Sequence, residues 1–270
     1  MIDFCVICND KTEQKIKFEY FKKPKVEKKY NLFKNKKYYR YYSECVNCKH
    51  WNSNFKFNTN KFYESSYNIK SYKDHKATFL KIINLKKKNS DNHYRSNRIK
   101  NFLDTKKKNK SIILDVGSGL GVFPYSMIKL GFKCDVIDPD IAMVNHMKNV
   151  LKNKKKGIYC ANFYRFNTKK KYDLLTLNKV LEHVENPVKF LLKAKKFLKD
   201  DGYIYMELPD IEEAKKDGKN REEFTIEHIQ GFNFSSVNKT IQKIKMRLEL
   251  FKRIKEPSGK YTFFCFIKKS

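Results

Sequence analysis

The chain has 270 residues, 40% of them hydrophobic, so it is long enough to bury a core, and it carries a formal charge of +31. It contains no run of about eighteen apolar residues, which excludes a transmembrane helix on sequence grounds, and its first ten residues lack the features of a signal peptide. Seven cysteines, an odd number, without a secretion signal predict a reducing compartment, and we expect the cytoplasm.

The N-terminal part of the chain contains two C-x-x-C pairs: Cys5 with Cys8, and Cys45 with Cys48. Each pair fits a tight turn that presents two thiolates to one metal ion, and two pairs supply the four sulfur ligands that zinc prefers. A closed four-cysteine shell leaves no open coordination position, so we expect a structural zinc rather than a catalytic one. Between the pairs, KIKFEYF and KYYRYY alternate as strands do. These features predict a small zinc-ribbon-like module over residues 1–58.

Residues 59–108 are expected to connect this module to a larger domain. Residues 62–72, FYESSYNIKSY, are rich in tyrosine. Residues 74–104 predict helix, interrupted by the polar sequence KKKNSDNH, and the lysine-rich residues 106–110 predict a solvated linker.

The sequence from Ser111 to Asp140 predicts a strand, a glycine turn, a helix and a second strand. Residues 112–116 are mostly apolar and β-branched, as expected of a strand buried on both faces of a parallel sheet. The turn that follows contains Gly117, Gly119 and Gly121, which allow the backbone to bend sharply and approach a ligand.

The second strand ends at Asp138, about twenty residues after the first glycine, where a carboxylate can bind ribose hydroxyls. This unit predicts a site for a nucleoside cofactor. Asp115 precedes the first glycine by two residues, and Val122 stands where a dinucleotide fingerprint has its third glycine. The pattern resembles motif I of the class I S-adenosylmethionine-dependent methyltransferases rather than an NAD site.

Residues 172–210 extend this resemblance. The predicted fourth strand leads into V-L-E-H-V at residues 180–184, followed by LKDDG before the fifth strand and ELP at its end. These sequences resemble a large methyltransferase group, and the resemblance covers roughly residues 60–270. It implies an α/β fold with a Rossmann-like seven-stranded sheet over residues 109–270, and S-adenosylmethionine as the cofactor.

The resemblance also implies which residues contact the cofactor. Pro139 would present its ring to the adenine and Asn162 would bind the adenine amino group, although many relatives have an acid at that position. Tyr63 and Tyr67 are candidates to lie over the cofactor. The full set of implied cofactor contacts outside the tyrosine-rich segment is Asp115, Gly117, Gly119, Gly121, Asp138, Pro139, Asn162, Phe163 and Asn178.

The last third of the chain contains the candidate catalytic residues. Glu227 and His228 begin EHIQGFNFS, which resembles a segment of polysaccharide-type methyltransferases in which the histidine is a candidate base. His183, after the fourth strand, is either a second candidate base or a structural histidine. The cysteine pairs likewise resemble the zinc-binding modules of sugar C-methyltransferases. The resemblance therefore implies polysaccharide biosynthesis, with methylation of a sugar nucleotide or cell-envelope saccharide at oxygen or carbon.

Several local features are predicted from the remaining sequence. Residues 248–254 and 261–267 predict an antiparallel final hairpin, and Ser235 is expected to cap the preceding helix. Three further cysteines fall in predicted strands and are expected in the core: Cys134, Cys160 and Cys265.

Two other functions are compatible with the composition. A nucleic-acid methyltransferase acting on RNA would use the +31 charge and the aromatic–basic module, whereas lysine-rich coding of exposed positions explains the charge without such a partner. No N-P-P-Y or D-P-P-Y sequence follows the fourth strand, which counts against methylation of a base amino group. A non-enzymatic interaction protein is the third alternative, and the intact Asp115 and Asp138 count against it. The sequence does not predict an oligomeric state.

Overall fold

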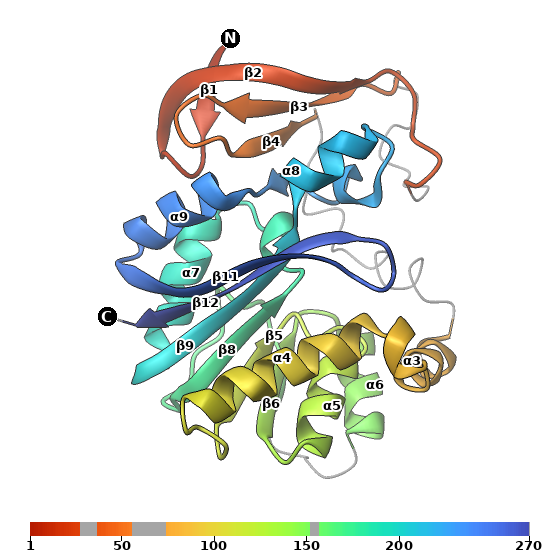
Figure 1. The fold of residues 1–270 in the computed structure, drawn as a ribbon, viewed down its shortest axis with the longest axis vertical. Coiled ribbons are helices and arrows are strands. Elements are labelled where there is room, and N and C mark those ends of the chain that lie inside the picture. The colour runs from red at the N-terminus through yellow and green to blue at the C-terminus, as the bar shows by residue number, and fades with distance from the viewer. Residues whose placement is uncertain (28–36, 56–73, 152–156, 270) are drawn as a thin grey trace.

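The computed structural model describes residues 1–27, 37–55, 74–151 and 157–269. Within these ranges the chain forms two sheets, one above the other in Figure 1. The larger sheet has seven strands in the order β11-β12-β9-β8-β5-β6-β7, and the smaller has five in the order β1-β2-β3-β4-β10.

The seven-stranded sheet is mostly parallel, with an antiparallel end. Its strands are β5 (Ile112–Val116), β6 (Lys133–Asp138), β7 (Ile158–Cys160), β8 (Tyr172–Asn178), β9 (Leu198–Pro209), β11 (Met246–Lys255) and β12 (Tyr261–Lys269). Strands β5 to β9 pair in parallel, β12 is antiparallel to β9, and β11 is antiparallel to β12. This topology confirms the predicted Rossmann-like α/β fold and its final hairpin.

Helices cover both faces of this sheet. Residues of α4, α5 and α6 pack in one apolar cluster, and residues of α7 and α9 pack in a second. Successive residues of β5 point to opposite faces of the sheet, so Ile113 belongs to the first cluster and Leu114 to the second. Helix α3 also contacts α5 and α6. The helices are α3 (His75–Ile83), α4 (Asp91–Thr105), α5 (Val122–Lys129), α6 (Ile141–Val150), α7 (Pro187–Lys196), α8 (Ile211–Ala214) and α9 (Phe234–Lys243), with single turns η2 (Lys87–Asn89), η3 (Leu181–His183), η4 (Lys215–Asp217) and η5 (Glu222–Phe224).

The five-stranded sheet combines the start of the chain with a segment close to its end. Its strands are β1 (Ile2–Cys5), β2 (Asp10–Tyr20), β3 (Arg40–Cys45), β4 (Trp51–Asn54) and β10 (Gln230–Gly231). β10 pairs antiparallel with β4, and Trp51 stacks on Phe224 with ring centroids 5.7 Å apart. The division of the chain at residues 58 and 108 stays a prediction, and the smaller sheet draws one strand from beyond both boundaries.

Some local expectations were wrong or fall outside the described ranges. Cys134 and Cys265 are buried, but Cys160 is exposed because β7 is an edge strand. Helix α9 is capped by Asn233 in a capping box with Ser236, not by Ser235, because the helix already begins at Phe234. The two candidate tyrosines, Tyr63 and Tyr67, lie outside the described residues. None of the described helices has the length and apolar character needed to cross a membrane.

Candidate active site

The glycine turn between β5 and α5 has a backbone shape that favours glycine. Gly117, Gly119 and Gly121 have φ of +70°, +50° and +71°. A Cβ at Gly117 would lie 2.9 Å from Val180, and one at Gly121 would lie 2.8 Å from Met147. A Cβ at Gly119 would meet no atom of the described residues within 4 Å. Gly119 is therefore the point of the turn that a ligand can approach.

Asp138, at the end of β6, supports this turn through its carboxylate. Its Oδ2 accepts a hydrogen bond from the N–H of Gly119 at 2.8 Å, and its Oδ1 accepts one from the N–H of Asp140 at 2.9 Å. The side chain is buried, and burial raises the pKa of this carboxyl to about 6. Each carboxylate oxygen has a further lone pair, so Asp138 can still accept a hydroxyl of a bound ribose.

Asp115 lies at the other side of the turn and contacts the neighbouring strand. Its Oδ1 accepts hydrogen bonds from the Thr176 hydroxyl at 2.6 Å and the Asn178 amide at 2.9 Å. Burial raises the pKa of Asp115 to about 6. The amide oxygen of Asn178 is buried and has no hydrogen-bond partner among the described residues. An oriented, unpartnered oxygen at this strand end fits a polar group of a ligand.

The residues expected near the adenine lie at the ends of β6 and β7. Pro139 and Asn162 are exposed, and the Asn162 side chain accepts a hydrogen bond from the N–H of Tyr164 at 2.9 Å. The Phe163 ring is buried against Phe190, with centroids 4.6 Å apart, so its backbone rather than its ring remains for a ligand. The open side of Gly119, the Asp138 carboxylate and the Asn178 oxygen together fit a nucleoside cofactor. Individual cofactor contacts stay predictions.

The structure brings together two histidines that are far apart in the sequence. The rings of His183, in η3, and His228 have centroids 5.0 Å apart. Nδ1 of His183 lies 2.8 Å from the carbonyl oxygen of Glu227, and Nδ1 of His228 lies 3.0 Å from that of Glu223. A carbonyl only accepts hydrogen bonds, so both Nδ1 atoms carry a proton. Burial, and to a smaller extent the charge of the adjacent His183, lowers the pKa of His228 to about 3. The His228 ring is therefore neutral.

Glu227, the third candidate catalytic residue, contacts His183 through its backbone. Its backbone carbonyl orients His183, and its side chain is buried with a charge that influences the pKa of both Glu27 and His228. Glu182, which precedes His183, was not predicted as a site residue. It lies within reach of both rings, and its place beside a candidate histidine in V-L-E-H-V was the available signal.

The N-terminal module holds the segment that carries His228. The Tyr42 hydroxyl of β3 lies 2.7 Å from the carbonyl oxygen of His228 and 3.1 Å from that of Thr225. Arg40 of the same strand donates to the carbonyl of Phe224 at 2.7 Å, and its guanidinium pairs with Glu27 at 2.8 Å. These side chains are buried, so the module fixes the backbone on which the candidate base stands.

The four cysteines of the two C-x-x-C pairs form one cluster. Cys5 Sγ lies 3.5 Å from Cys48 Sγ, Cys8 Sγ lies 3.8 Å from Cys45 Sγ, and all four sulfurs lie within 4.8 Å of one another. A tetrahedral zinc with bonds of about 2.3 Å separates its sulfur ligands by about 3.8 Å, which these distances fit.

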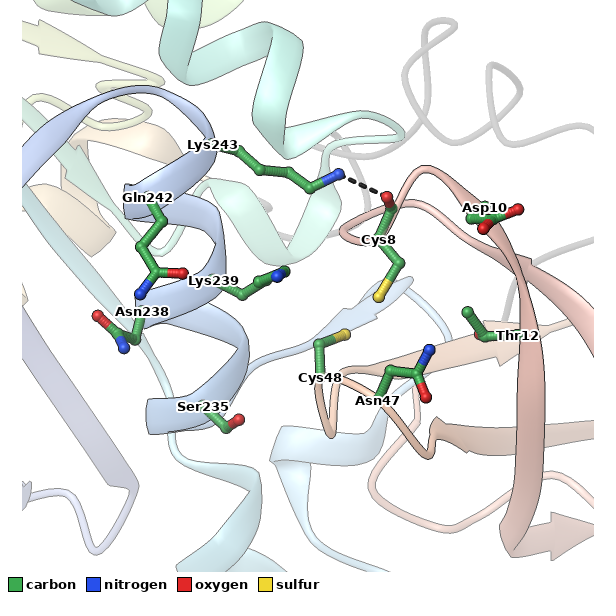
Figure 2. A pocket seen from close by; sticks show the side chains of 10 residues that line it. All are labelled: Cys8, Asp10, Thr12, Asn47, Cys48, Ser235, Asn238, Lys239, Gln242 and Lys243. Carbon is green, nitrogen blue, oxygen red and sulfur yellow. Dashed lines mark hydrogen bonds between the residues drawn. The ribbon is translucent and has the colours of Figure 1, made fainter.

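A cleft of about 450 Å³ lies between this cluster and α9. Figure 2 shows Cys8 and Cys48 on one side and the polar side chains of α9 on the other, with Lys243 hydrogen-bonded to the carbonyl of Cys8. Helix α9 of the larger sheet's layer therefore contacts the turn that carries the first cysteine pair.

A seven-stranded sheet of this topology, with a glycine turn and an acid at adjacent strand ends, defines the class of S-adenosylmethionine-dependent methyltransferases. The chain belongs to the methyltransferase domain family, whose sequence model matches residues 89–249. No curated protein matches the chain in sequence.

Solved structures share the fold at low sequence identity. A Burkholderia thailandensis 1,6-didemethyltoxoflavin N1-methyltransferase, with bound 1,6-didemethyltoxoflavin and S-adenosylhomocysteine, is 11% identical with a TM-score of 0.59; the match covers 83% of this chain and 97% of that one. A Synechocystis magnesium protoporphyrin IX methyltransferase with bound S-adenosylmethionine is 12% identical with a TM-score of 0.57, covering 80% of this chain and 100% of that one. A plantazolicin methyltransferase in complex with a triazolic desmethylPZN analogue and S-adenosylhomocysteine is 14% identical with a TM-score of 0.57; the match covers 78% of this chain and 94% of that one.

Proposed function

We propose that this methyltransferase acts on a saccharide, either a sugar nucleotide or a cell-envelope saccharide, at oxygen or at an acidic carbon. The observation that carries the proposal is the His183–His228 pair. His183 lies in η3, just beyond the carboxyl end of β8, with the His228 ring beside it, and ligands of open α/β sheets bind beyond the carboxyl ends of the strands. The saccharide class rests on the resemblance of the EHIQGFNFS segment and the cysteine module to sugar C-methyltransferases.

S-adenosylmethionine supplies a methyl group on a sulfonium, which needs little activation beyond alignment with the acceptor. The chain's own task is to bind the cofactor and to manage the proton of the acceptor. Asp138 would hold the ribose hydroxyls, and the N-terminal amides of α5 would face the methionyl carboxylate. His183 or His228, whose rings are adjacent, would accept the proton of a sugar hydroxyl or acidic carbon, and the lowered pKa of His228 makes that ring a weak base.

We also propose that Cys5, Cys8, Cys45 and Cys48 bind a structural zinc ion. The sulfur separations support it, as does the burial of three of the four side chains. The ion would fix β1 to β4, and through Tyr42 and Arg40 it would support the segment that ends at His228.

A labelling experiment tests the acceptor class. Purified protein and methyl-labelled S-adenosylmethionine are incubated with an extract of the source cells, which is then separated into nucleic-acid, protein and small-molecule or glycan fractions. We expect nuclease-resistant label in the last fraction, and none with Asp138→Ala. Nuclease-sensitive label would instead show that the +31 charge serves a nucleic-acid substrate.

A further inference from the structure

Glu182 is a fully buried carboxyl group without a hydrogen-bond partner. Its exposed fraction is 0%, and neither of its side-chain oxygens is bonded to any described residue. A buried charge without a partner is costly. A protonated Glu182 would also lack a hydrogen bond in this arrangement, because His183 Nε2, at 4.0 Å, lies beyond hydrogen-bond distance. A group of this kind in a folded protein indicates a partner beyond the described residues, and a bound ion is one such partner.

Two imidazoles complete a possible set of ligands around Glu182. A carboxylate oxygen of Glu182 and one ring nitrogen each of His183 and His228 all lie within 4.8 Å of one another, and Glu182 Oε1 lies 4.0 Å from His183 Nε2. Each ring donates its Nδ1 proton to a backbone carbonyl, at 2.8 Å for His183 and 3.0 Å for His228. Metal-binding histidines are held in this way, with one ring nitrogen oriented by a carbonyl and the other directed to the ion.

We propose that Glu182, His183 and His228 bind a divalent transition-metal ion beyond the end of β8. Two imidazoles and one carboxylate form the ligand set of open zinc sites and of non-haem iron sites, whereas magnesium and calcium prefer oxygen ligands alone. Tetrahedral bonds of about 2.1 Å place ligand atoms about 3.4 Å apart, so small side-chain rotations close the site. Three protein ligands leave a position for water or an acceptor oxygen.

Lys179 carries a nearby positive charge that would repel a cation at this site, but its ammonium group is hydrogen-bonded to another residue. Its ammonium donates to the Thr262 hydroxyl at 2.6 Å, and no ion pair within 4.0 Å joins it to Glu182 among the described residues. Glu207, another acid near Lys179, is already paired with Arg95 and Arg98, so it does not compete for the ion. Glu182 is therefore the carboxylate left for a metal.

The role of the ion rests on the proposed function, whereas its binding does not. A metal-coordinated sugar hydroxyl has a lowered pKa and loses its proton to water. The methyl group then passes to that oxygen as its bond to the sulfonium sulfur breaks, giving a methyl ether and S-adenosylhomocysteine. In this form of the reaction His183 and His228 hold the ion instead of accepting the proton.

Equilibrium dialysis of the full-length, zinc-loaded protein against Co²⁺, followed by metal analysis, tests the binding. We expect about one cobalt per chain in the wild type with the cysteine-bound zinc retained, and a loss of at least tenfold in cobalt affinity in Glu182→Gln and His228→Ala. His93→Ala is the matched control, because this half-buried histidine lies on α4 and contacts Asn97. Cobalt should also raise the Tm of the wild type and of the control, but not that of His228→Ala.

Wild-type protein that binds no cobalt beyond exchange of its zinc would overturn the proposal. Retention of cobalt by both site variants would overturn it equally. Activity of the wild type before and after chelation separates this inference from the proposed function. Chelator-resistant activity that His228→Ala abolishes supports the base and refutes the catalytic role of the ion, whereas bound cobalt without saccharide labelling supports the metal site and refutes the acceptor class.

Discussion

The phenol of Tyr42 lies 2.7 Å from the backbone carbonyl of His228, and this partly buried hydrogen bond joins the cysteine module to the candidate active site. The two residues are 186 positions apart. A contact over this distance in the sequence makes the module part of the site's framework, and it leads to the first prediction.

Tyr42→Phe should lower kcat while leaving S-adenosylmethionine affinity unchanged. The change removes the hydroxyl that the Thr225 and His228 carbonyls share, and unpartnered buried carbonyls cost about 1–3 kcal/mol. We expect a kcat reduction of about tenfold or more, because a base that is misplaced loses most of its contribution. Tyr41→Phe is the control, since the hydroxyl of Tyr41 is exposed and its hydrogen bond within the described part of the chain is a long one to the Met1 sulfur, at 4.0 Å. Equal loss in both variants would contradict a positioning role for Tyr42.

Asp138→Ala should weaken S-adenosylmethionine binding by about 100-fold, because hydrogen bonds to a charged acceptor contribute about 1.5–3 kcal/mol each. Isothermal titration calorimetry measures the affinity, and circular dichroism checks that the fold is retained. Unchanged affinity in a folded variant would mean that another carboxylate binds the ribose.

Gly119→Ala should reduce cofactor affinity more than it reduces stability. Its Cβ would point into space that no described protein atom occupies, so a bound cofactor is what it would meet. Gly259→Ala provides the matched control, because it also has positive φ, +84°, and open space, but lies in the β11–β12 turn. Both variants should lose about 1–2 kcal/mol of stability from the left-handed backbone. If Gly119→Ala binds the cofactor as tightly as Gly259→Ala does, the cofactor does not approach the turn at this residue.

The stability of the cofactor-free protein should depend on the ionisation of Asp138. Burial raises its pKa to about 6, so between about pH 4 and pH 6 the folded chain binds more protons than the unfolded one. The protonated Asp138 carboxyl therefore contributes to the free energy of unfolding, and this contribution is complete below about pH 4 and is lost as the pH rises through about 6. Asp138→Asn removes this titration, so its free energy of unfolding should rise relative to wild type by up to about 3 kcal/mol from pH 4 to pH 7. Urea unfolding at several pH values measures the difference, and a constant difference would refute the shifted pKa.

Loss of the proposed zinc should reduce methyl transfer without abolishing cofactor binding. Cys48→Ser removes one of the four sulfur ligands, and the strands that hold Tyr42 and Arg40 lose their anchor. Cys265→Ser controls for the loss of a buried thiol, because Cys265 lies on β12 of the seven-stranded sheet and does not belong to the four-cysteine group. Full activity of a zinc-free Cys48→Ser protein would separate the module from catalysis.

The sequence predicted the α/β sheet well because its signals are local. The strand, turn, helix and acid of residues 111–140 each follow from short patterns, and the structure has them at β5, α5 and β6. The cysteine pairs converge as their spacing suggested, since four thiolates carry a recognisable chemistry. Cys160 was mispredicted because an apolar strand pattern does not show whether the strand lies at an edge.

The anchoring of the histidine segment could not be predicted in the same way. Tyr42 and Arg40 belong to a strand rich in aromatic and basic residues. The alternation of its residues predicts a β-strand but does not show which segment its side chains contact. Their contacts with residues 224–228 depend on β10 joining β4, and a two-residue strand gives no periodic signal. Glu182 was missed because its distinguishing property, burial without a partner, exists only in three dimensions.

The pairing of β10 with β4 also constrains the order of events during synthesis. Residues 2–54 leave the ribosome long before Gln230, yet their sheet has its last strand, and the cover of Trp51, only when residues 224–231 arrive. A nascent chain therefore exposes aromatic side chains of the module until most of the sheet of the larger layer has been made. Chaperone binding to the first sixty residues during translation, and its release near residue 230, is the expected sign of this delay.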